Sequence, residues 1–185
     1  MIQPHADKIC KMISDKFKYK GFVFDLNLKD HNCAKESEDA FKKIYLQEFT
    51  DGYNITDGLK TYKYVYVSIL EDGVAAVVGK TTFHCTSENS GTDTKMYGNN
   101  DLFNAYKGKE LTAQLIAAHY NIDIDGAGGS KQVNMKVKKA VIIPVNTDGL
   151  KNTTYEDRTK ELEKRIGNFL VSEQIFILNG ASHLH

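Results

Sequence analysis

A short β-hairpin is the feature of the sequence that most constrains its fold. Residues 62–70 read Tyr-Lys-Tyr-Val-Tyr-Val-Ser-Ile-Leu, the densest run of β-branched and aromatic side chains in the chain. Such runs favour strands, and the Glu-Asp-Gly that follows at residues 71–73 is a turn signal. Residues 74–78 supply the return strand, which ends in Gly-Lys-Thr-Thr at residues 79–82. The sequence therefore predicts an antiparallel hairpin that runs from Tyr64 to Thr82.

Helical and strand patterns lie on both sides of this hairpin. Apolar periodicity and capping residues predict helices over residues 6–17, 36–49, 101–120 and 155–170. Strands are expected over residues 22–28, 137–145 and 174–178, a polar loop over residues 87–100, and a flexible joint over residues 125–130. These elements indicate an α+β (α/β mixed) fold in which helices flank a small antiparallel sheet. We expect an N-terminal α/β extension over residues 1–60, packed as one unit on a domain that spans residues 61–185.

Composition narrows the classes of protein to consider. With 41% hydrophobic and 26% charged residues in 185, the chain resembles ordinary globular proteins. It has no stretch of about 18 apolar residues, as a membrane span requires, and its charged N-terminal residues do not read as a secretory signal. Three cysteines, Cys10, Cys33 and Cys85, cannot all pair within one chain. We therefore expect reduced thiols and a cytoplasmic location.

Two short stretches of the sequence resemble familiar motifs, a P-loop and a zinc site, but neither has the spacing that the motif requires. A phosphate-binding P-loop has four residues between its first glycine and its Gly-Lys pair. Here five residues separate Gly73 from Gly79, and those five residues are typical of a strand, not of a loop. A zinc site would need paired ligands two to four residues apart. The pairs His31–Cys33 and His84–Cys85 lack that spacing.

The hairpin carries a resemblance to a known enzyme family. Tyr64-Val65-Tyr66 on the first strand and Val77-Val78-Gly79-Lys80-Thr81 on the second resemble the paired motifs of the GIY-YIG nucleases. The predicted order after the hairpin is also similar to that family: helices, a third strand, a helix that carries acidic residues, and a later asparagine. The resemblance spans about residues 62–179.

The resemblance implies a metal-dependent endonuclease that hydrolyses DNA. Tyr66 would help to activate water, and Lys80 would contact phosphate or lower the pKa of Tyr66. Glu163 would hold Mg²⁺ or Mn²⁺, with Glu161 as second choice, since one carboxylate is enough for a hard cation that keeps most of its waters. His84 stands as a candidate substitute for the family's arginine, as does Lys95.

The sequence also departs from the family pattern. Tyr64 replaces the glycine of the first motif, Val77 replaces the tyrosine of the second, and no arginine precedes Arg158. These departures favour an alternative, a catalytically inactive nucleic-acid- or protein-binding module on the same fold. A structural or interaction protein, which could form a homodimer, is a further alternative.

A basic segment lies beside the predicted third strand. It comprises Lys131, Lys136, Lys138 and Lys139. Such lysines can form a phosphate-contacting face, and they can equally protect an edge strand from aggregation. Because the formal net charge of the chain is zero, we do not expect a strongly electrostatic, nonspecific binder.

Overall fold

An antiparallel sheet forms the centre of the computed structural model, which describes residues 2–49, 52–56, 59–86, 96–97, 102–103, 110–146 and 152–180. Within these ranges six strands pair in the order β1-β6-β3-β4-β5, and β2 pairs with the first residues of β3. The strands are β1 (Phe22–Asp25), β2 (Tyr53–Thr56), β3 (Leu59–Leu70), β4 (Ala75–Thr86), β5 (Met96–Tyr97) and β6 (Val137–Pro144). The helices are α1 (Ile2–Phe17), α2 (His31–Glu48), α3 (Leu111–Tyr120), α4 (Gly129–Lys136) and α5 (Asn152–Ser172).

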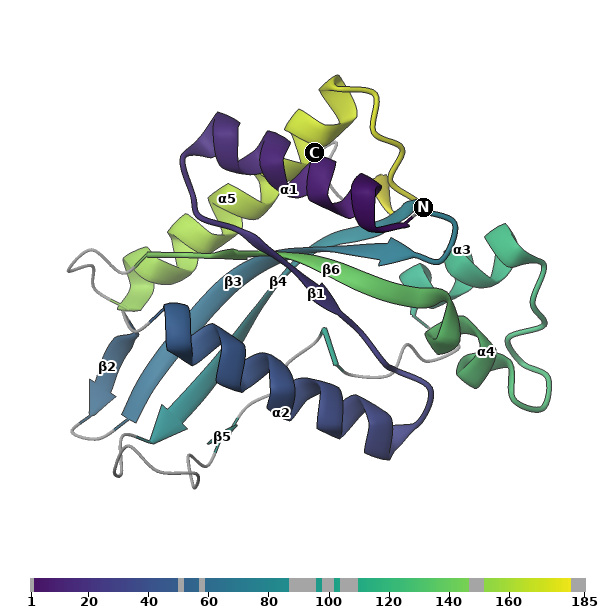
Figure 1. The fold of residues 1–185 in the computed structure, drawn as a ribbon, viewed down its shortest axis with the longest axis horizontal. Helices are drawn as coiled ribbons and strands as arrows, with labels where there is room; N and C mark the ends of the chain where they lie inside the picture. Colours follow the sequence, from purple (N-terminus) through teal and green to yellow (C-terminus); the bar gives the residue numbers. More distant parts are fainter. Residues whose placement is uncertain are drawn as a thin grey trace.

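Helices cover both faces of this sheet (Figure 1). In that view α1 and α5 lie above the sheet, α2 lies below it, and α3 and α4 lie at the end where the β3–β4 hairpin turns. The chain is thus a mixed α+β protein whose sheet is sandwiched between helices, which agrees with the fold class expected from the sequence.

The β3–β4 hairpin is present as predicted and is longer than expected. Its strands pair from Leu59 opposite Thr86 to Ile69 opposite Ala75. Gly73 adopts a positive φ of 91° in the turn, a conformation that glycine reaches without steric cost. The side chain of Asp72 accepts a hydrogen bond of 3.0 Å from the Val74 N–H, which closes the turn.

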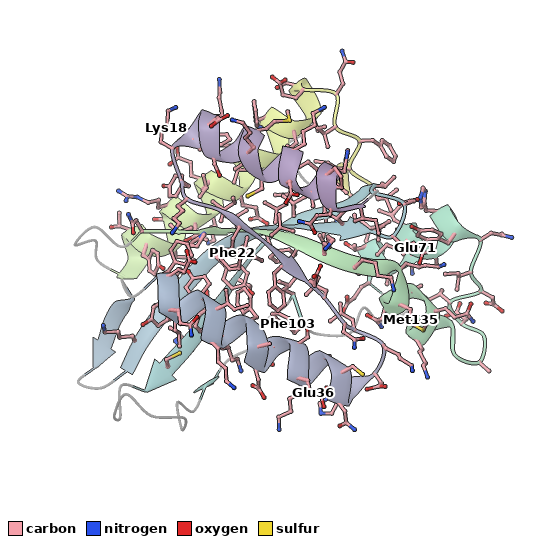
Figure 2. All side chains as sticks on the ribbon, in the orientation of Figure 1. Lys18, Phe22, Glu36, Glu71, Phe103 and Met135 are labelled. Carbon is pink, nitrogen blue, oxygen red and sulfur yellow. The ribbon has the colours of Figure 1, made fainter. Side chains whose placement is uncertain are left out.

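The two faces of the sheet have different cores. Toward α1 and α5 the sheet presents aliphatic side chains such as Val65, Val67 and Val141, which pack on Ile9 of α1 and Ile166 of α5. Toward α2 it presents aromatic side chains instead. They are Tyr62, Tyr64, Tyr66 and Phe83, and they pack with Phe41 and Tyr45 of α2. Figure 2 shows side chains filling both spaces between the sheet and the helices.

Local sequence explains where these helices form. Ile9 and Ile13 lie one helical turn apart on α1 and are fully buried. The helix α2 begins five residues before the predicted start, because Asp30 caps it by accepting a 2.9 Å hydrogen bond from the Cys33 N–H. Phe41 and Tyr45, again four residues apart, bury the face of α2 that contacts the sheet.

The N-terminal segment is an integral part of the sheet. β1 pairs with β6 from Phe22 opposite Ile142 to Asp25 opposite Lys139. Residues 2–49 also provide one helix for each face of the sheet, α1 and α2. The expected extension therefore shares its sheet and both cores with the hairpin.

Several elements differ from the sequence expectation. Helix α4 forms where a flexible joint was expected to continue to Ser130, and Leu102 and Phe103 lie in a turn where a helix was expected. The segment expected as a final strand makes only an isolated bridge, from Ile177 to Ala75. Met96 and Tyr97 pair with β4 inside the expected polar loop. The rest of that loop, including Lys95, and residues 104–109 lie outside the described residues.

The three cysteines are unpaired in the structure, and Cys10 and Cys85 are buried. Across the ranges that the structure describes, no helix has the length and apolar character that crossing a bilayer would require.

Candidate functional site on the α5 face of the hairpin

Tyr66, the predicted water-activating residue, faces α2. It pairs with Gly79 across the hairpin and is only 7% exposed, within the aromatic core. A Cβ built at Gly79 would stand 2.6 Å from both Cζ and the hydroxyl oxygen of Tyr66, so the ring lies across the glycine. The glycine of the second motif therefore makes room for the tyrosine of the first.

Lys80, by contrast, projects toward α5, because neighbouring residues in a strand alternate between faces. It pairs with Val65, whose side chain belongs to the core under α1 and α5. Tyr66 and Lys80 thus lie on opposite faces of the hairpin, and the predicted site that combined them is not assembled.

On the α5 face, two lysines of the hairpin share one carboxylate, and Lys160 of α5 lies 3.9 Å from it. Glu156 of α5 binds Lys63 Nζ at 2.6 Å through Oε2 and Lys80 Nζ at 2.9 Å through Oε1. The Lys63 side chain is only 9% exposed and also donates to Thr82 Oγ1 at 3.2 Å. The hydrogen bond from Lys63, followed by that from Lys80, lowers the pKa of Glu156 to about 2. Glu156 is therefore ionised at neutral pH.

Tyr155 fixes the start of α5 against the sheet. Its hydroxyl accepts a hydrogen bond of 2.7 Å from the Lys63 backbone N–H and donates one of 3.0 Å to the Val145 carbonyl. The side chain is fully buried, and burial raises its pKa. One residue thus ties α5 to β3 and to the end of β6, which positions the neighbouring Glu156.

The predicted metal ligand Glu163 belongs to this face as well. Half-buried on α5, its carboxyl has a pKa raised by burial, an effect opposed by the charge of Lys80 and reinforced by that of Glu156. The second choice, Glu161, is different: its side chain is 70% exposed and lies 3.8 Å from Arg165 one turn along the helix. The structure therefore brings Glu163, and not Glu161, into the electrostatic neighbourhood of Lys80.

His84 lies at the edge of this cluster. Its Nδ1 is 2.6 Å from Thr61 Oγ1 on the paired strand. Burial, together with the charge of Lys63, lowers the pKa of the imidazole, so it is neutral at physiological pH. Four residues of extended strand separate His84 from Lys80, about 13 Å. A neutral imidazole at that distance does not reproduce the charge of the family's arginine.

The cluster can be compared with the needs of a Mg²⁺ ion. Among the described residues no group of three or more His, Cys, Asp and Glu side chains could hold a metal. Both oxygens of Glu156 already bind lysines. Mg²⁺ sites can use one protein carboxylate and take their other ligands from water and substrate phosphate, and Glu163 is the carboxylate of this face that the sequence assigns to that role.

The four lysines beside β6 do not share one face. Lys138 and Lys139 are adjacent on β6, so their side chains point to opposite sides of the sheet. Lys139 pairs with Asp25 of β1, and its side chain is only 14% exposed. Lys136 pairs with Glu71 and lies 4.7 Å from the centre of the Tyr120 ring. Lys131 is exposed on α4.

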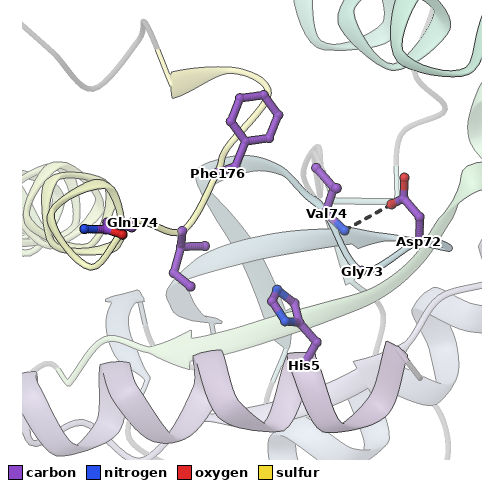
Figure 3. A pocket seen from close by; sticks show the side chains of 7 residues that line it. His5, Asp72, Gly73, Val74, Gln174 and Phe176 are labelled. Carbon is purple, nitrogen blue, oxygen red and sulfur yellow. Dashed lines mark hydrogen bonds between the residues drawn. The ribbon is translucent and has the colours of Figure 1, made fainter.

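A separate pocket lies at the turn of the hairpin (Figure 3). It has a volume of about 290 Å³ and includes His5 of α1, Asp72 and Val74 of the turn, and the exposed Phe176. Asp72 also binds His119 Nε2 at 2.6 Å. None of the predicted site residues lines this pocket.

Comparison with known proteins adds no relative. No protein-family model matches the sequence, and neither the curated proteins nor the solved structures include a significant match.

Sequence reasoning missed the central residues of the cluster, namely Lys63, Tyr155 and Glu156. A signal for Lys63 does exist: it is the one charged residue in the strand segment 62–70, where an ionised side chain needs a partner. The identity of that partner depends on the position of α5 over the sheet, which the sequence does not specify.

Proposed function

We propose that this chain is a metal-dependent endonuclease that hydrolyses phosphodiester bonds in DNA, with its site on the α5 face of the hairpin. The observation that carries the proposal is that Glu163 lies in the electrostatic field of Lys80. Lys80 in turn shares the carboxylate of Glu156 with a second lysine, Lys63. Positive charge beside a carboxylate of raised pKa suits a site that receives a phosphate and a hard cation.

Lys80 is the residue of this site that reaches a phosphate. Its side chain is 30% exposed, whereas that of Lys63 is nearly buried. When a phosphate oxygen replaces Glu156 as the partner of Lys80, Lys63 still neutralises Glu156. The carboxylate therefore keeps a partner, and no unpaired charge is left at the start of α5.

Glu163 is the residue that would hold Mg²⁺ or Mn²⁺. A bound ion of this kind lowers the pKa of a coordinated water and neutralises charge on the phosphate. Glu163 must be ionised to bind it, and its raised pKa makes that step dependent on pH. Neither Tyr66 nor His84 takes part in this proposal.

The test is cleavage of supercoiled plasmid DNA with and without Mg²⁺ or Mn²⁺. We expect metal-dependent cutting by the parent and a loss of about 100-fold or more in Glu163→Gln and Lys80→Ala. Two variants are matched controls. Glu161→Gln removes an exposed carboxylate two residues from Glu163, and Tyr66→Phe removes the hydroxyl on the opposite face. Both should cut within about threefold of the parent, a difference well below 1.4 kcal/mol.

The pattern of losses decides between mechanisms. Cutting by Glu163→Gln at the parental rate would contradict the assigned metal ligand. A large loss in Tyr66→Phe with full activity in Lys80→Ala would move the site to the α2 face.

A second candidate is a catalytically inactive nucleic-acid-binding module. The burial of Tyr66 against Gly79 favours it, because the tyrosine on which the family resemblance depends is turned away from Lys80 and Glu163. Metal-independent DNA binding by the parent, without cutting under any metal condition, is the result expected of this candidate.

A further inference from the structure

A second pocket lies at the opposite end of the sheet from the hairpin turn. It has a volume of about 450 Å³, within the range of small-molecule sites. The end of α1, the residue after α2 and the end of β6 enclose it. Its lining residues are Phe17, Lys18, Tyr19, Lys20, Phe49, Pro144 and Asn146.

Basic and aromatic residues alternate along one wall of this pocket. Residues 16–20 read Lys-Phe-Lys-Tyr-Lys, and no acidic residue occurs between residues 16 and 24. Lys20 binds Glu48 at 2.7 Å. Lys18 is exposed, and within the described part of the chain it has no ion-pair partner. The charge of Lys18 contributes to lowering the pKa of Asp15, after the larger effect of Lys11, but no described carboxylate holds the Lys18 ammonium at ion-pair distance, so it can bind an anion.

The backbone at Lys18 is unusual. Its φ is +61°, the left-handed conformation that ends many helices and normally selects glycine. The Lys18 N–H donates a 2.9 Å hydrogen bond to the Ser14 carbonyl, as such an ending requires. Figure 2 labels Lys18 at this turn after α1. Asn121 after α3 and Gln174 after α5 adopt the same conformation, so it ends three helices of this chain; at Lys18 it turns the chain from α1 toward the pocket.

The aromatic rings of the pocket differ in how firmly they are held. Phe17 contacts Phe169 edge-on, with ring centroids 5.5 Å apart, and Phe49 stacks on Phe22 at 5.8 Å. Tyr19 is half-buried: it packs in part against the core under α1 and α5, and it has no ring partner among the described residues. The part of Tyr19 that is not buried lines the pocket, where it can contact a planar ligand.

The pocket adjoins the charged cluster on the α5 face. Pro144 and Asn146 line the pocket, and Val145 stands between them. The Val145 N–H donates a 3.0 Å hydrogen bond to the Lys63 carbonyl, and its carbonyl accepts from the Tyr155 hydroxyl. One residue of backbone therefore separates the pocket from the segment that carries Lys63.

We propose that this pocket binds one nucleotide of a single-stranded nucleic acid, with the base against Tyr19 and the phosphate at Lys18. A partly exposed aromatic ring beside an exposed lysine matches how proteins bind unpaired strands, where bases stack on aromatic side chains and lysines follow the backbone. In a duplex the bases are already stacked on one another, so the pocket selects an unpaired one. This binding does not depend on cleavage by the neighbouring cluster.

The test is fluorescence anisotropy of a labelled dT12 oligonucleotide titrated with the full chain. We expect Tyr19→Ala to weaken binding about tenfold and Tyr19→Phe, which keeps the ring, to bind like the parent. Lys18→Ala should weaken binding and reduce the slope of log K against log salt by about 0.7, the value for one phosphate contact. Lys8→Ala is the matched control, because it removes an exposed lysine of α1 that does not line the pocket.

Competition identifies the ligand more closely. Unlabelled dT12 should displace the probe at far lower concentration than the mononucleotide dTMP. Equal potency per molecule would assign the pocket to free nucleotides and overturn the proposed strand. Parental affinity in both Tyr19→Ala and Lys18→Ala, or no binding of dT12 at low salt, would overturn the pocket itself. Binding lost in these variants but unaccompanied by cutting in the parent would uphold the pocket and reject the nuclease.

Discussion

Tyr66 lies across Gly79 of the neighbouring strand, so closely that an added Cβ would stand 2.6 Å from the ring. Because Tyr66 is nearly buried in the aromatic core, the ring has little room to move away. We expect Gly79→Ala to lower the free energy of unfolding by about 1–3 kcal/mol, the usual cost of overpacking. Urea denaturation measures this loss.

A matched control for this substitution is available elsewhere in the chain. A Cβ at Gly180 would meet no atom within 4 Å, so Gly180→Ala should change stability by no more than about 0.5 kcal/mol. Equal stabilities of the two variants would show that the ring yields without cost. Combining Gly79→Ala with Tyr66→Leu should restore part of the loss if the clash with the ring is its cause.

The hairpin and the longest helices were predictable because their patterns are strong and local. The alternation in residues 62–70 and the spacing of Ile9 and Ile13 each identify one element without reference to the rest. Helix α4 was missed because its eight residues begin with glycine and show little apolar periodicity. Its burial depends on contacts with α3 and β6 that no local pattern reveals.

The assembly of the predicted site failed for a specific reason. Near the turn Ile69 pairs with Ala75, but after an irregularity at Ser68 the pairing shifts by one residue, and Tyr66 pairs with Gly79. Without that shift Tyr66 would pair with Val78 and share a face with Lys80. A one-residue slip exchanges the two faces of a strand, and nothing in the turn sequence reports the bulge.

The ion pair between the nearly buried Lys63 and the partly exposed Glu156 should contribute to stability in a pH-dependent way. Glu156→Gln leaves the Lys63 ammonium, 9% exposed, without its carboxylate. We expect a loss on the order of 2 kcal/mol at pH 7, typical of hydrogen bonds to charged groups. Glu161→Gln, which removes an exposed pair, should cost at most about 1 kcal/mol.

The sign of the pH effect follows from the pKa of Glu156. It falls from 4.5 to about 2 on folding, so the unfolded chain binds more protons between these values. The contribution of ionised Glu156 to the free energy of unfolding is therefore complete above about pH 4.5 to 5, and it is lost as the pH falls toward 2. The stabilities of the parent and Glu156→Gln should converge in that range. A difference that stays constant down to pH 2 would mean that packing, not charge, is responsible.

The lysines beside β6 should have little effect on nucleic-acid affinity. Lys139 is held by Asp25, and Lys136 is held by Glu71 and the Tyr120 ring. We expect Lys136→Ala and Lys139→Ala to bind dT12 within about twofold of the parent at low salt, since their charges are already compensated. Anisotropy titrations beside Lys18→Ala provide the comparison. A loss in Lys139→Ala as large as that in Lys18→Ala would restore the basic face expected from the sequence.

Glu163 should reduce stability at the pH where the proposed enzyme works. Burial raises its pKa on folding, so the native chain binds more protons than the unfolded chain as the pH rises above the ordinary value of 4.5. The free energy of unfolding of the parent therefore falls as the pH rises from 4.5 through the raised pKa of Glu163. Glu163→Gln has no charge to bury, so it should be more stable than the parent at neutral pH. The difference should close as the pH falls below 4.5, and thermal unfolding at several pH values measures it.

A variant that gains stability while losing metal-dependent cutting would identify Glu163 as a residue retained for function at a cost to the fold. If Glu163→Gln instead lowers stability at neutral pH, the carboxylate has a structural partner, and its assignment as the metal ligand falls with that result.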